Sequence, residues 1–290
     1  MKKTVLITGA SAGFGADSAK SLARAGHRVF ATMRNITEKS APKTAAELRG
    51  AGIEVLELDV TSDASVGRAF DEIYAKTGGT LDVLVNNAGQ FFAGISEAFT
   101  ADQVMAMFDV NVFGVQRVTR AALPSMRKSG TGLIINIGSI LGRVTIPFVG
   151  IYGASKHALE ALTESYRYEL SQLGVDVVLV QPGPFATSLY AAPQQPGDPG
   201  RVSEYGEVAG LTGKIGEVLA GFFQSGNAPQ PHEVAVTLEQ LIATPAGQRP
   251  ARVVVGAGFG AAEANIAMQP LQAQLLHGFD YDHLATLKAE

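Results

Sequence analysis

Tyr152 and Lys156, two residues that can pass a proton to or from a bound molecule, lie four positions apart in this 290-residue chain. The stretch from Ile151 to Leu173 has the length and apolar spacing of a helix, so both side chains are expected on one helix face with converging polar ends. A free tyrosine titrates at pH ~10, and a neighbouring ammonium lowers that pKa by favouring the phenolate. In isolation such a pair is more often structural, so its meaning depends on the rest of the sequence.

A glycine-rich turn stands near the start of the chain, in the segment Thr8-Gly9-Ala10-Ser11-Ala12-Gly13-Phe14-Gly15. It follows an apolar run at Lys3 to Thr8 and precedes a helical pattern at Phe14 to Ala25. Glycines permit a tight turn and let backbone N–H groups approach a pyrophosphate, whose charge is favoured at the positive end of the following helix. A turn between a strand and a helix predicts a nucleotide-binding unit.

Short β-branched runs alternate with helical segments along most of the chain, which predicts a parallel, doubly wound α/β sheet with helices on both faces. Parallel strands are buried on both sides and read as continuous apolar runs. Seven strands are expected, at Lys3–Thr8, Arg28–Thr32, Ile53–Leu58, Leu81–Val85, Leu133–Ile137, Val175–Val180 and Arg252–Val255. The helices expected between them include Phe14–Ala25, Ser62–Lys76, Ala101–Lys128 and Ile151–Leu173.

This pattern predicts one Rossmann-type domain over residues 1–290. It is interrupted at 189–231, where Ala191 to Gly200 has loop composition and Lys214 to Phe223 could form a short helix. Because this segment follows the sixth strand, it should lie over the ligand site as a substrate-binding insertion; a disordered surface loop is the alternative. The extension at 257–290 could cap the pocket, extend an interface or simply pack.

Composition narrows the class of partner. The formal net charge is −4 and no block of Lys or Arg occurs, so we expect no nucleic acid partner and no binding to an anionic membrane surface. The absence of cysteine excludes disulfides and thiolate metal sites, and we expect a cytoplasmic protein with no metal site. The start of the chain reads as a first strand, and Leu133 to Ala154 is too interrupted for a membrane span.

The glycine spacing GxxxGxG is the first of five ordered motifs in which the sequence resembles the classical branch of the short-chain dehydrogenase/reductase family. The resemblance covers about Lys3 to Ser188, with a weaker tail to Gly256. The other motifs, in chain order, are Asn86-Asn87-Ala88-Gly89, Val110-Asn111-Val112, Ser139 with Tyr152-Gly153-Ala154-Ser155-Lys156, and Pro182-Gly183-Pro184 with Thr187. Phe14 departs from the isoleucine or leucine common in the family.

The resemblance implies roles for these residues. Tyr152 is then the general acid/base and a cofactor contact, and Lys156 also binds the nicotinamide ribose. Ser139 holds the substrate oxygen and Asn111 anchors a water chain. Asp59 and Val60 match the adenine position. The remaining cofactor contacts that the resemblance implies are Gly9, Ser11, Gly13, Phe14, Gly15, Asn86, Ala88, Gly89, Pro182, Gly183, Phe185 and Thr187.

The choice between NAD and NADP depends on the residues at the end of the second strand, where a carboxylate would accept hydrogen bonds from the ribose diol and repel a phosphate. Met33 stands there instead and Arg34 follows. A guanidinium can make paired, charged hydrogen bonds to a ribose phosphate, and Ser11 could also contact it. NADP(H) is therefore the expected cofactor, with NAD(H) possible because Arg34 could instead stack on adenine.

These residues together predict an NADP(H)-dependent oxidoreductase that interconverts a ketone or aldehyde and an alcohol. Its small-molecule substrate is expected to be apolar, as in the steroid- and retinoid-type members. Apolar residues flank the site and would give an apolar pocket if they turn inward, although most could equally belong to the core: Phe91, Phe92, Leu141, Phe148, Phe185 and Leu189. The alternatives are an NAD-dependent dehydrogenase and a non-catalytic NADP sensor, with an epimerase or dehydratase less favoured. The resemblance also implies a homo-oligomer, a dimer or tetramer.

Overall fold

A single seven-stranded sheet organises the computed structural model of the chain, which describes residues 1–36, 41–190, 193–226 and 228–288. All strand pairs are parallel and the strand order is β3-β2-β1-β4-β5-β6-β7. The strands are β1 (Thr4–Ile7), β2 (Arg28–Met33), β3 (Glu54–Glu57), β4 (Val83–Asn86), β5 (Gly132–Ile137), β6 (Val175–Pro182) and β7 (Arg252–Val255). The sequence-based prediction of seven parallel strands is confirmed, with bounds that differ by at most two residues.

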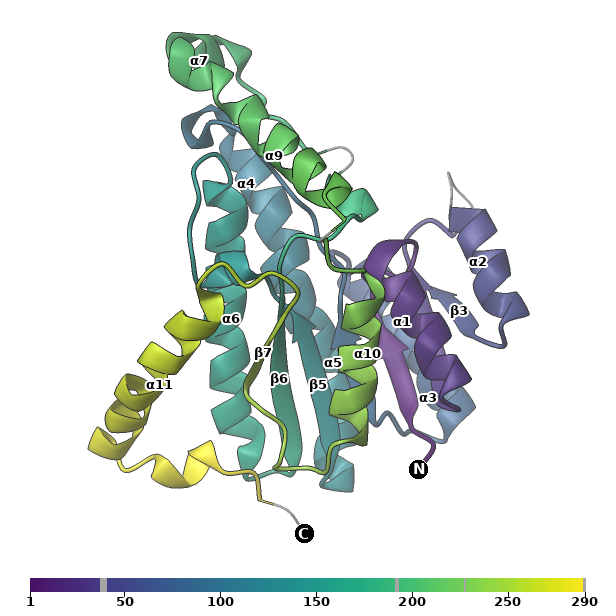
Figure 1. Cartoon of the computed structure of the whole chain (residues 1–290). Coiled ribbons are helices and arrows are strands. Elements are labelled where there is room, and N and C mark those ends of the chain that lie inside the picture. The colour runs from purple at the N-terminus through teal and green to yellow at the C-terminus, as the bar shows by residue number, and fades with distance from the viewer. Residues whose placement is uncertain (37–40, 191–192, 227, 289–290) are drawn as a thin grey trace.

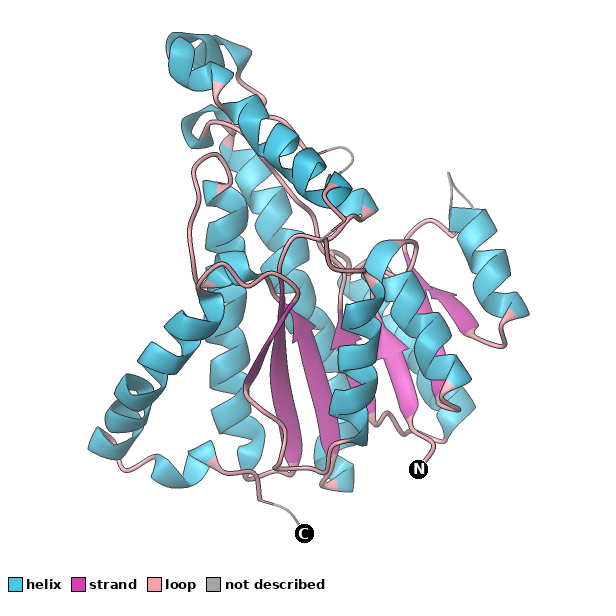
Figure 2. Ribbon diagram, in the orientation of Figure 1, coloured by secondary structure: helices cyan, strands magenta, loops and turns pink. Residues whose placement is uncertain are grey.

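Helices cover both faces of the sheet (Figure 1, Figure 2). One core packs α1 (Gly13–Arg24), α2 (Ala41–Gly50) and α10 (His232–Ala243) against the sheet. The opposite core packs α3 (Asp63–Thr77), α5 (Gly114–Ser129) and α6 (Gly150–Ser171) against it. Strands buried on both sides explain the continuous apolar runs, since every residue of β6 is buried.

The strand order reverses between β1 and β4, because the chain runs outward from β1 to β3 and then returns to the other side of β1. The loops after β1 and β4 therefore lead to opposite faces and leave a crevice at the carboxyl ends of these strands. Ligands bind at such switch points in open parallel sheets. The glycine-rich turn after β1 and the Asn-Asn-Ala-Gly motif at the end of β4 both lie there.

The helix expected over Ala101–Lys128 is helical throughout but has three parts. A π-helical segment, Asp109–Phe113, joins α4 (Ala101–Phe108) to α5. Such π segments often occur at functional sites because they change which side chains face inward. Asn111 lies in this segment and its residue is 1% exposed.

The insertion at 189–231 contains more helix than the sequence indicates. The expected short helix is present as α9 (Thr212–Gln224), and α7 (Pro199–Glu204) and α8 (Glu207–Gly210) were not expected. Asp198 begins α7 by accepting a hydrogen bond from the Arg201 backbone N–H, with proline at the first helical position. Ala191 and Ala192, expected in a loop, lie outside the described residues. Together α7, α8 and α9 project beyond the carboxyl ends of the strands (Figure 1).

The C-terminal extension forms a second projection, α11 (Ala261–Gly278), which buries only Ala261. Its first turns are tied to the body by Asn265, which accepts a hydrogen bond from Arg143 Nε at 2.9 Å and donates one to Gln181 Oε1 at 2.7 Å. Within the described residues, no helix is long and apolar enough to cross a membrane, and no cluster of side chains is arranged to hold a metal ion.

Candidate active site

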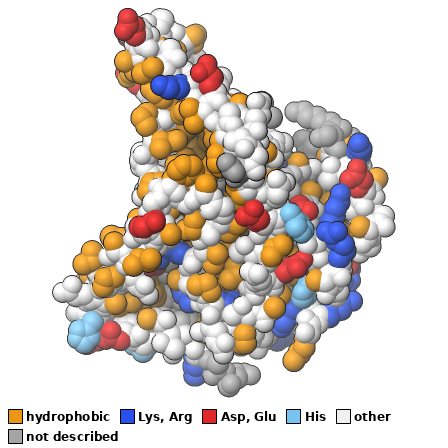
Figure 3. All heavy atoms as spheres, in the orientation of Figure 1, with side chains coloured by type: hydrophobic (Ala, Val, Ile, Leu, Met, Phe, Trp, Pro, Cys, Tyr) orange, Lys and Arg blue, Asp and Glu red, His pale blue; other side chains and the backbone are white. Residues whose placement is uncertain are grey.

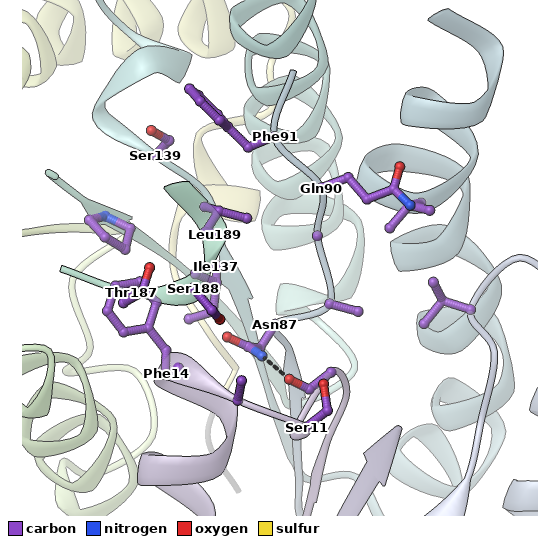
Figure 4. A pocket seen from close by; sticks show the side chains of 18 of the residues that line it. Ser11, Phe14, Asn87, Gln90, Phe91, Ile137, Ser139, Thr187, Ser188 and Leu189 are labelled. Atoms are coloured by element: carbon purple, nitrogen blue, oxygen red, sulfur yellow. Dashed lines mark hydrogen bonds between the residues drawn. The ribbon is translucent and has the colours of Figure 1, made fainter. Parts of the chain in front are cut away.

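One cavity of about 480 Å³ lies at the carboxyl ends of the strands (Figure 4). It extends from the glycine-rich turn and Arg34 at one end to Tyr152, Leu189 and Tyr190 at the other. Of the residues predicted for the site, these line it: Gly9, Ser11, Gly13, Phe14, Arg34, Asp59, Val60, Ala88, Gly89, Ser139, Tyr152, Lys156, Pro182, Gly183 and Thr187. Segments that are far apart in the sequence therefore share one cavity.

The glycine-rich turn has this composition because two of its positions leave no room for a side chain. Gly9 has φ +68°, and a Cβ there would lie 2.7 Å from Ala88 Cα. A Cβ on Gly15 would lie 2.5 Å from Asn87 Nδ2. Helix α1 then begins at Gly13 with no side chain capping its first N–H groups. These donors and the positive end of the helix suit an anionic group such as a pyrophosphate.

Asn87 joins the ends of β1 and β4. Its Nδ2 donates hydrogen bonds to the carbonyls of Thr8 and Gly9 at 2.9 and 3.0 Å, and its side chain is labelled in Figure 4. In return, the Thr8 hydroxyl accepts from the backbone N–H groups of Asn87 and Ala88 at 3.0 and 3.1 Å. Asn87 lines the cavity but was not singled out as a site residue, although it lies inside a quoted motif.

The end of the cavity near β2 is lined by one cationic side chain, Arg34, and one carboxylate, Asp59. Both Met33 and Arg34 line the cavity, but Arg34 is exposed, whereas Met33 is 2% exposed and also packs in the core. Asp59 also lines the cavity, but its Oδ1 accepts hydrogen bonds from the backbone N–H and hydroxyl of Thr61. No carboxylate follows β2 directly, so Arg34 is the charged side chain offered to a ribose at this position.

At the other end, Tyr152 is 5% exposed and packs edge-on against Phe91, with ring centroids 4.9 Å apart. Lys156 Nζ lies 5.7 Å from the centroid of the Tyr152 ring and donates a hydrogen bond to the Ile137 carbonyl at 2.9 Å. The Ser139 hydroxyl accepts from the Leu141 N–H at 3.1 Å and hydrogen-bonds with Tyr152. The geometry brings a phenol, a hydroxyl and an ammonium to one wall of the cavity.

Asn111 supports this wall from behind rather than lining the cavity. Its Oδ1 accepts from the Gln90 N–H at 2.8 Å, and its Nδ2 donates to the Gln90 carbonyl at 3.1 Å and to Ser155 Oγ at 3.0 Å. Ser155 Oγ in turn donates to the Tyr152 carbonyl at 2.7 Å. Asn111 is thus connected to the backbone of Tyr152 and to the loop after β4.

Gly15, Asn86 and Phe185, predicted as cofactor contacts, do not line the cavity either. Asn86 Nδ2 donates to Thr119 Oγ1 and Asn136 Oδ1 between β4 and its neighbours. The Phe185 side chain is fully buried in the core, where its ring packs edge-on against Phe14 at 5.3 Å.

Of the apolar residues predicted for the substrate side, Phe91, Phe92 and Leu189 line the cavity, with Leu141 packed against them. Phe148 does not line it. Cavity residues that the prediction missed include Gln90, Ser188, Tyr190 and Gln194.

Burial controls the protonation of the Tyr152 and Lys156 pair. Loss of solvation raises the pKa of Tyr152, the nearby Tyr190 raises it further, and hydrogen bonding with Ser139 offsets only part of the rise. The sequence predicts the opposite direction, a pKa lowered by Lys156, and that prediction is wrong for this structure. Burial also lowers the pKa of Lys156, to about 8, and its Nζ is bound to the Ile137 carbonyl.

Comparison with known proteins gives the family. A sequence model described as short chain dehydrogenase matches residues 3–196. The chain is 40% identical over 183 residues to a 3-ketodihydrosphingosine reductase of Bacteroides thetaiotaomicron, which covers 63% of this chain. It is also 40% identical over 189 residues to retinol dehydrogenase 8 of Bos taurus, which covers 64% of this chain. The matched regions span 64% and 60% of these relatives' own lengths.

Among solved structures, a variant of actinorhodin polyketide ketoreductase with NADPH has a TM-score of 0.74 and 29% identity, covering 90% of this chain and 97% of that one. The chain belongs to the short-chain dehydrogenase family, in its classical branch. The named relatives are dehydrogenases and reductases, and the family uses NAD(P)(H) and acts on small molecules.

The lowered pKa of Lys156 can be measured directly. In protein labelled with ¹³Cε-lysine, and with Lys156→Met used for assignment, we expect the Lys156 resonance to titrate with a midpoint near 8. Lys76, whose pKa is raised by hydrogen bonds to Glu72 and Glu54, should titrate at higher pH in the same spectra. Between pH about 8 and ~10.4, Lys156 is protonated in the unfolded chain but mostly deprotonated in the folded protein. The free energy of unfolding that Lys156 contributes therefore increases as the pH rises through this range. A Lys156 midpoint no lower than that of Lys76 would contradict the effect of burial.

Proposed function

We propose that this enzyme is an NADP(H)-dependent reductase and dehydrogenase that interconverts a ketone or aldehyde and an alcohol, with Tyr152 as the general acid/base and an apolar substrate. The observation that carries the proposal is that Ser139, Tyr152 and Lys156 line the same cavity as the glycine-rich turn. A nucleotide bound at the turn and a substrate bound at Tyr152 would therefore meet in one cavity.

The residues of the nucleotide end fit a dinucleotide phosphate. Gly9 and Gly15 leave no room for a Cβ and Gly13 has φ +55°, and the uncapped start of α1 would offer N–H donors to the pyrophosphate. Arg34, with Ser11, would hold a ribose phosphate, and Asp59 and Val60 would contact the adenine. When bound, the nicotinamide supplies the hydride in reduction and accepts it in oxidation.

The other end supplies the proton. Burial keeps Tyr152 protonated at neutral pH, which suits it to donate a proton to the carbonyl oxygen as negative charge develops there. Ser139, which hydrogen-bonds with Tyr152, would hold the same oxygen, and preorganised donors of this kind contribute a few kcal/mol to transition-state stabilisation. Lys156, with its pKa lowered to about 8, is still mainly protonated at pH 7 and is positioned to restore the proton balance of Tyr152.

Asn111 is proposed as the residue that connects this pair with solvent through water. Its contacts with Gln90 and Ser155 fix the loop after β4 behind Lys156. A Cβ added to Gly89 would lie 3.5 Å from Asn111 Oδ1 and 3.9 Å from Lys156 Nζ. The two side chains are thus near neighbours across the Gly89 backbone.

The substrate side of the cavity is apolar and aromatic, formed by Phe91, Phe92, Leu189 and Tyr190. We propose that residues 1–290 form one domain in which 189–231 is the substrate-binding insertion and 257–290 an extension. Two of the relatives' names, retinol dehydrogenase and 3-ketodihydrosphingosine reductase, support an apolar carbonyl or alcohol as the substrate class. A homo-oligomer and a cytoplasmic location stay predictions.

Removal of the Tyr152 hydroxyl should separate binding from chemistry. In Tyr152→Phe we expect NADPH affinity to be kept, because the hydroxyl is remote from the glycine-rich turn, while turnover of ketones falls by orders of magnitude. The measurement is oxidation of NADPH at 340 nm, with NADPH binding followed by calorimetry. Tyr166→Phe, on the same helix but packed in the core opposite, is the matched control and should keep full turnover. Near-normal turnover in Tyr152→Phe would remove the proposed proton donor.

Arg34 should determine the choice of dinucleotide. In Arg34→Asp we expect the preference to move from NADPH toward NADH by at least tenfold in kcat/KM, because a carboxylate repels the ribose phosphate and accepts from a free diol. Kinetics with both dinucleotides measure this ratio. Arg24→Asp, at the far end of α1, makes the same change of charge away from the cavity and should leave the ratio unaltered. An unchanged ratio in Arg34→Asp would assign the selectivity to another residue and favour the NAD-dependent alternative.

A further inference from the structure

A row of aromatic rings leads from Tyr152 out of the cavity to the protein surface. Successive ring centroids are 4.9, 5.1, 6.1, 5.9 and 6.4 Å apart, all within the range of aromatic contacts. In order, the rings belong to Tyr152, Phe91, Tyr190, Phe223, Phe222 and Phe259. We call this set the aromatic row. It is assembled from α6, the loop after β4, the end of the segment after β6, α9 and the loop between β7 and α11.

The outer part of the aromatic row is not part of a closed core. Helix α9 buries none of its residues, and Phe222 and Phe223 are only partly covered, as are Ile215 and Leu219 on the preceding turns. The spacing of these four residues, i, i+4, i+7 and i+8, defines one apolar helix face. In Figure 3 hydrophobic side chains gather where the projection formed by α7 to α9 meets the body of the molecule. An apolar face left partly open beside a site calls for a ligand to cover it.

Phe259, the last ring, is unusual in two ways. Its side chain is 65% exposed, and its backbone has φ +44°, in the left-handed region that a bulky residue rarely adopts. Two glycines, Gly258 and Gly260, flank it. Backbone strain of this kind persists where the surroundings require it and is concentrated at ligand-binding positions. Here it presents a phenyl ring at the end of the aromatic row.

We propose that the aromatic row is one wall of a groove that binds the long, unbranched alkyl tail of the carbonyl substrate. The inference rests on the proposed function, because it places the reacting carbon at Tyr152 and the tail along Phe91, Tyr190 and α9 toward Phe259. No charged side chain belongs to the row, so a polar tail would lose its solvation there without gaining partners. Short ketones fill only the inner part of the site, and selectivity for chain length comes from Phe222 and Phe259.

The test is the affinity of the enzyme for methyl ketones of increasing length, hexan-2-one, nonan-2-one and dodecan-2-one, measured by calorimetry. Burial of a methylene is worth ~0.8 kcal/mol, so the affinity should rise by up to about fourfold per added methylene. In Phe222→Ala and Phe259→Ala the gain from nonan-2-one to dodecan-2-one should be lost. Phe279→Ala, which removes an equally exposed ring at the far end of α11, should keep the gain.

Each outcome decides the proposal. Affinities that do not rise with chain length, or a rise that persists in both Phe222→Ala and Phe259→Ala, would overturn it. Turnover of the same ketones is measured in parallel with NADPH. If the affinities follow the expected pattern but no ketone is reduced, the groove is supported and the proposed reaction fails. If hexan-2-one is reduced and the affinities are flat with length, the reaction stands and the groove is wrong.

Discussion

The hydrogen bonds between Thr8 and the segment Asn87–Ala88 fix the point on which the site depends. They hold the carboxyl ends of β1 and β4 at one separation, and the strand order reverses at the same place. Because the two backbones approach so closely, Gly9 cannot carry a side chain, and the Asn87 side chain together with the Gly9 carbonyl leaves no room for one at Gly15. The shape of the glycine-rich end of the cavity thus follows from the way β1 and β4 are joined. The next strands of the sheet, β5 and β6, place the Tyr152 end of the cavity beside it.

Loss of solvation is the main electrostatic effect at the Tyr152 end. It opposes charge on both members of the pair, raising the pKa of Tyr152 and lowering that of Lys156 to about 8. At neutral pH, loss of solvation therefore favours a protonated Tyr152 phenol beside a Lys156 ammonium that can give up its proton at little cost in free energy. Such a site is better prepared to donate a proton to a carbonyl than to take one from an alcohol, which agrees with a reductase direction near neutral pH and oxidation at higher pH.

Much of the fold could be predicted from the sequence, because strands buried on both faces need continuous apolar runs, as in β6. Helix α11 could not be predicted, because it buries only Ala261 and has Pro270 in its interior. Its sequence therefore lacks the amphipathic period that indicates a helix. The cavity residues inside ordered motifs were predictable by resemblance. Phe185 was assigned to the cofactor but its ring lies in the core against Phe14, a contact that spacing cannot reveal. The sign of the Tyr152 pKa shift and the aromatic row depend on burial and on contacts between distant segments, which only the structure provides.

The transfer of hydride itself gives the most direct test of the account. Enzyme, NADPH deuterated at C4 of the nicotinamide, and a series of apolar ketones and aldehydes are incubated in ordinary water, and the alcohols are analysed by mass spectrometry. We expect the wild-type enzyme to form an alcohol that carries one deuterium on the former carbonyl carbon. Binding of NADPH without any deuterated alcohol across the series would contradict it and would favour a protein that senses the dinucleotide without turning it over.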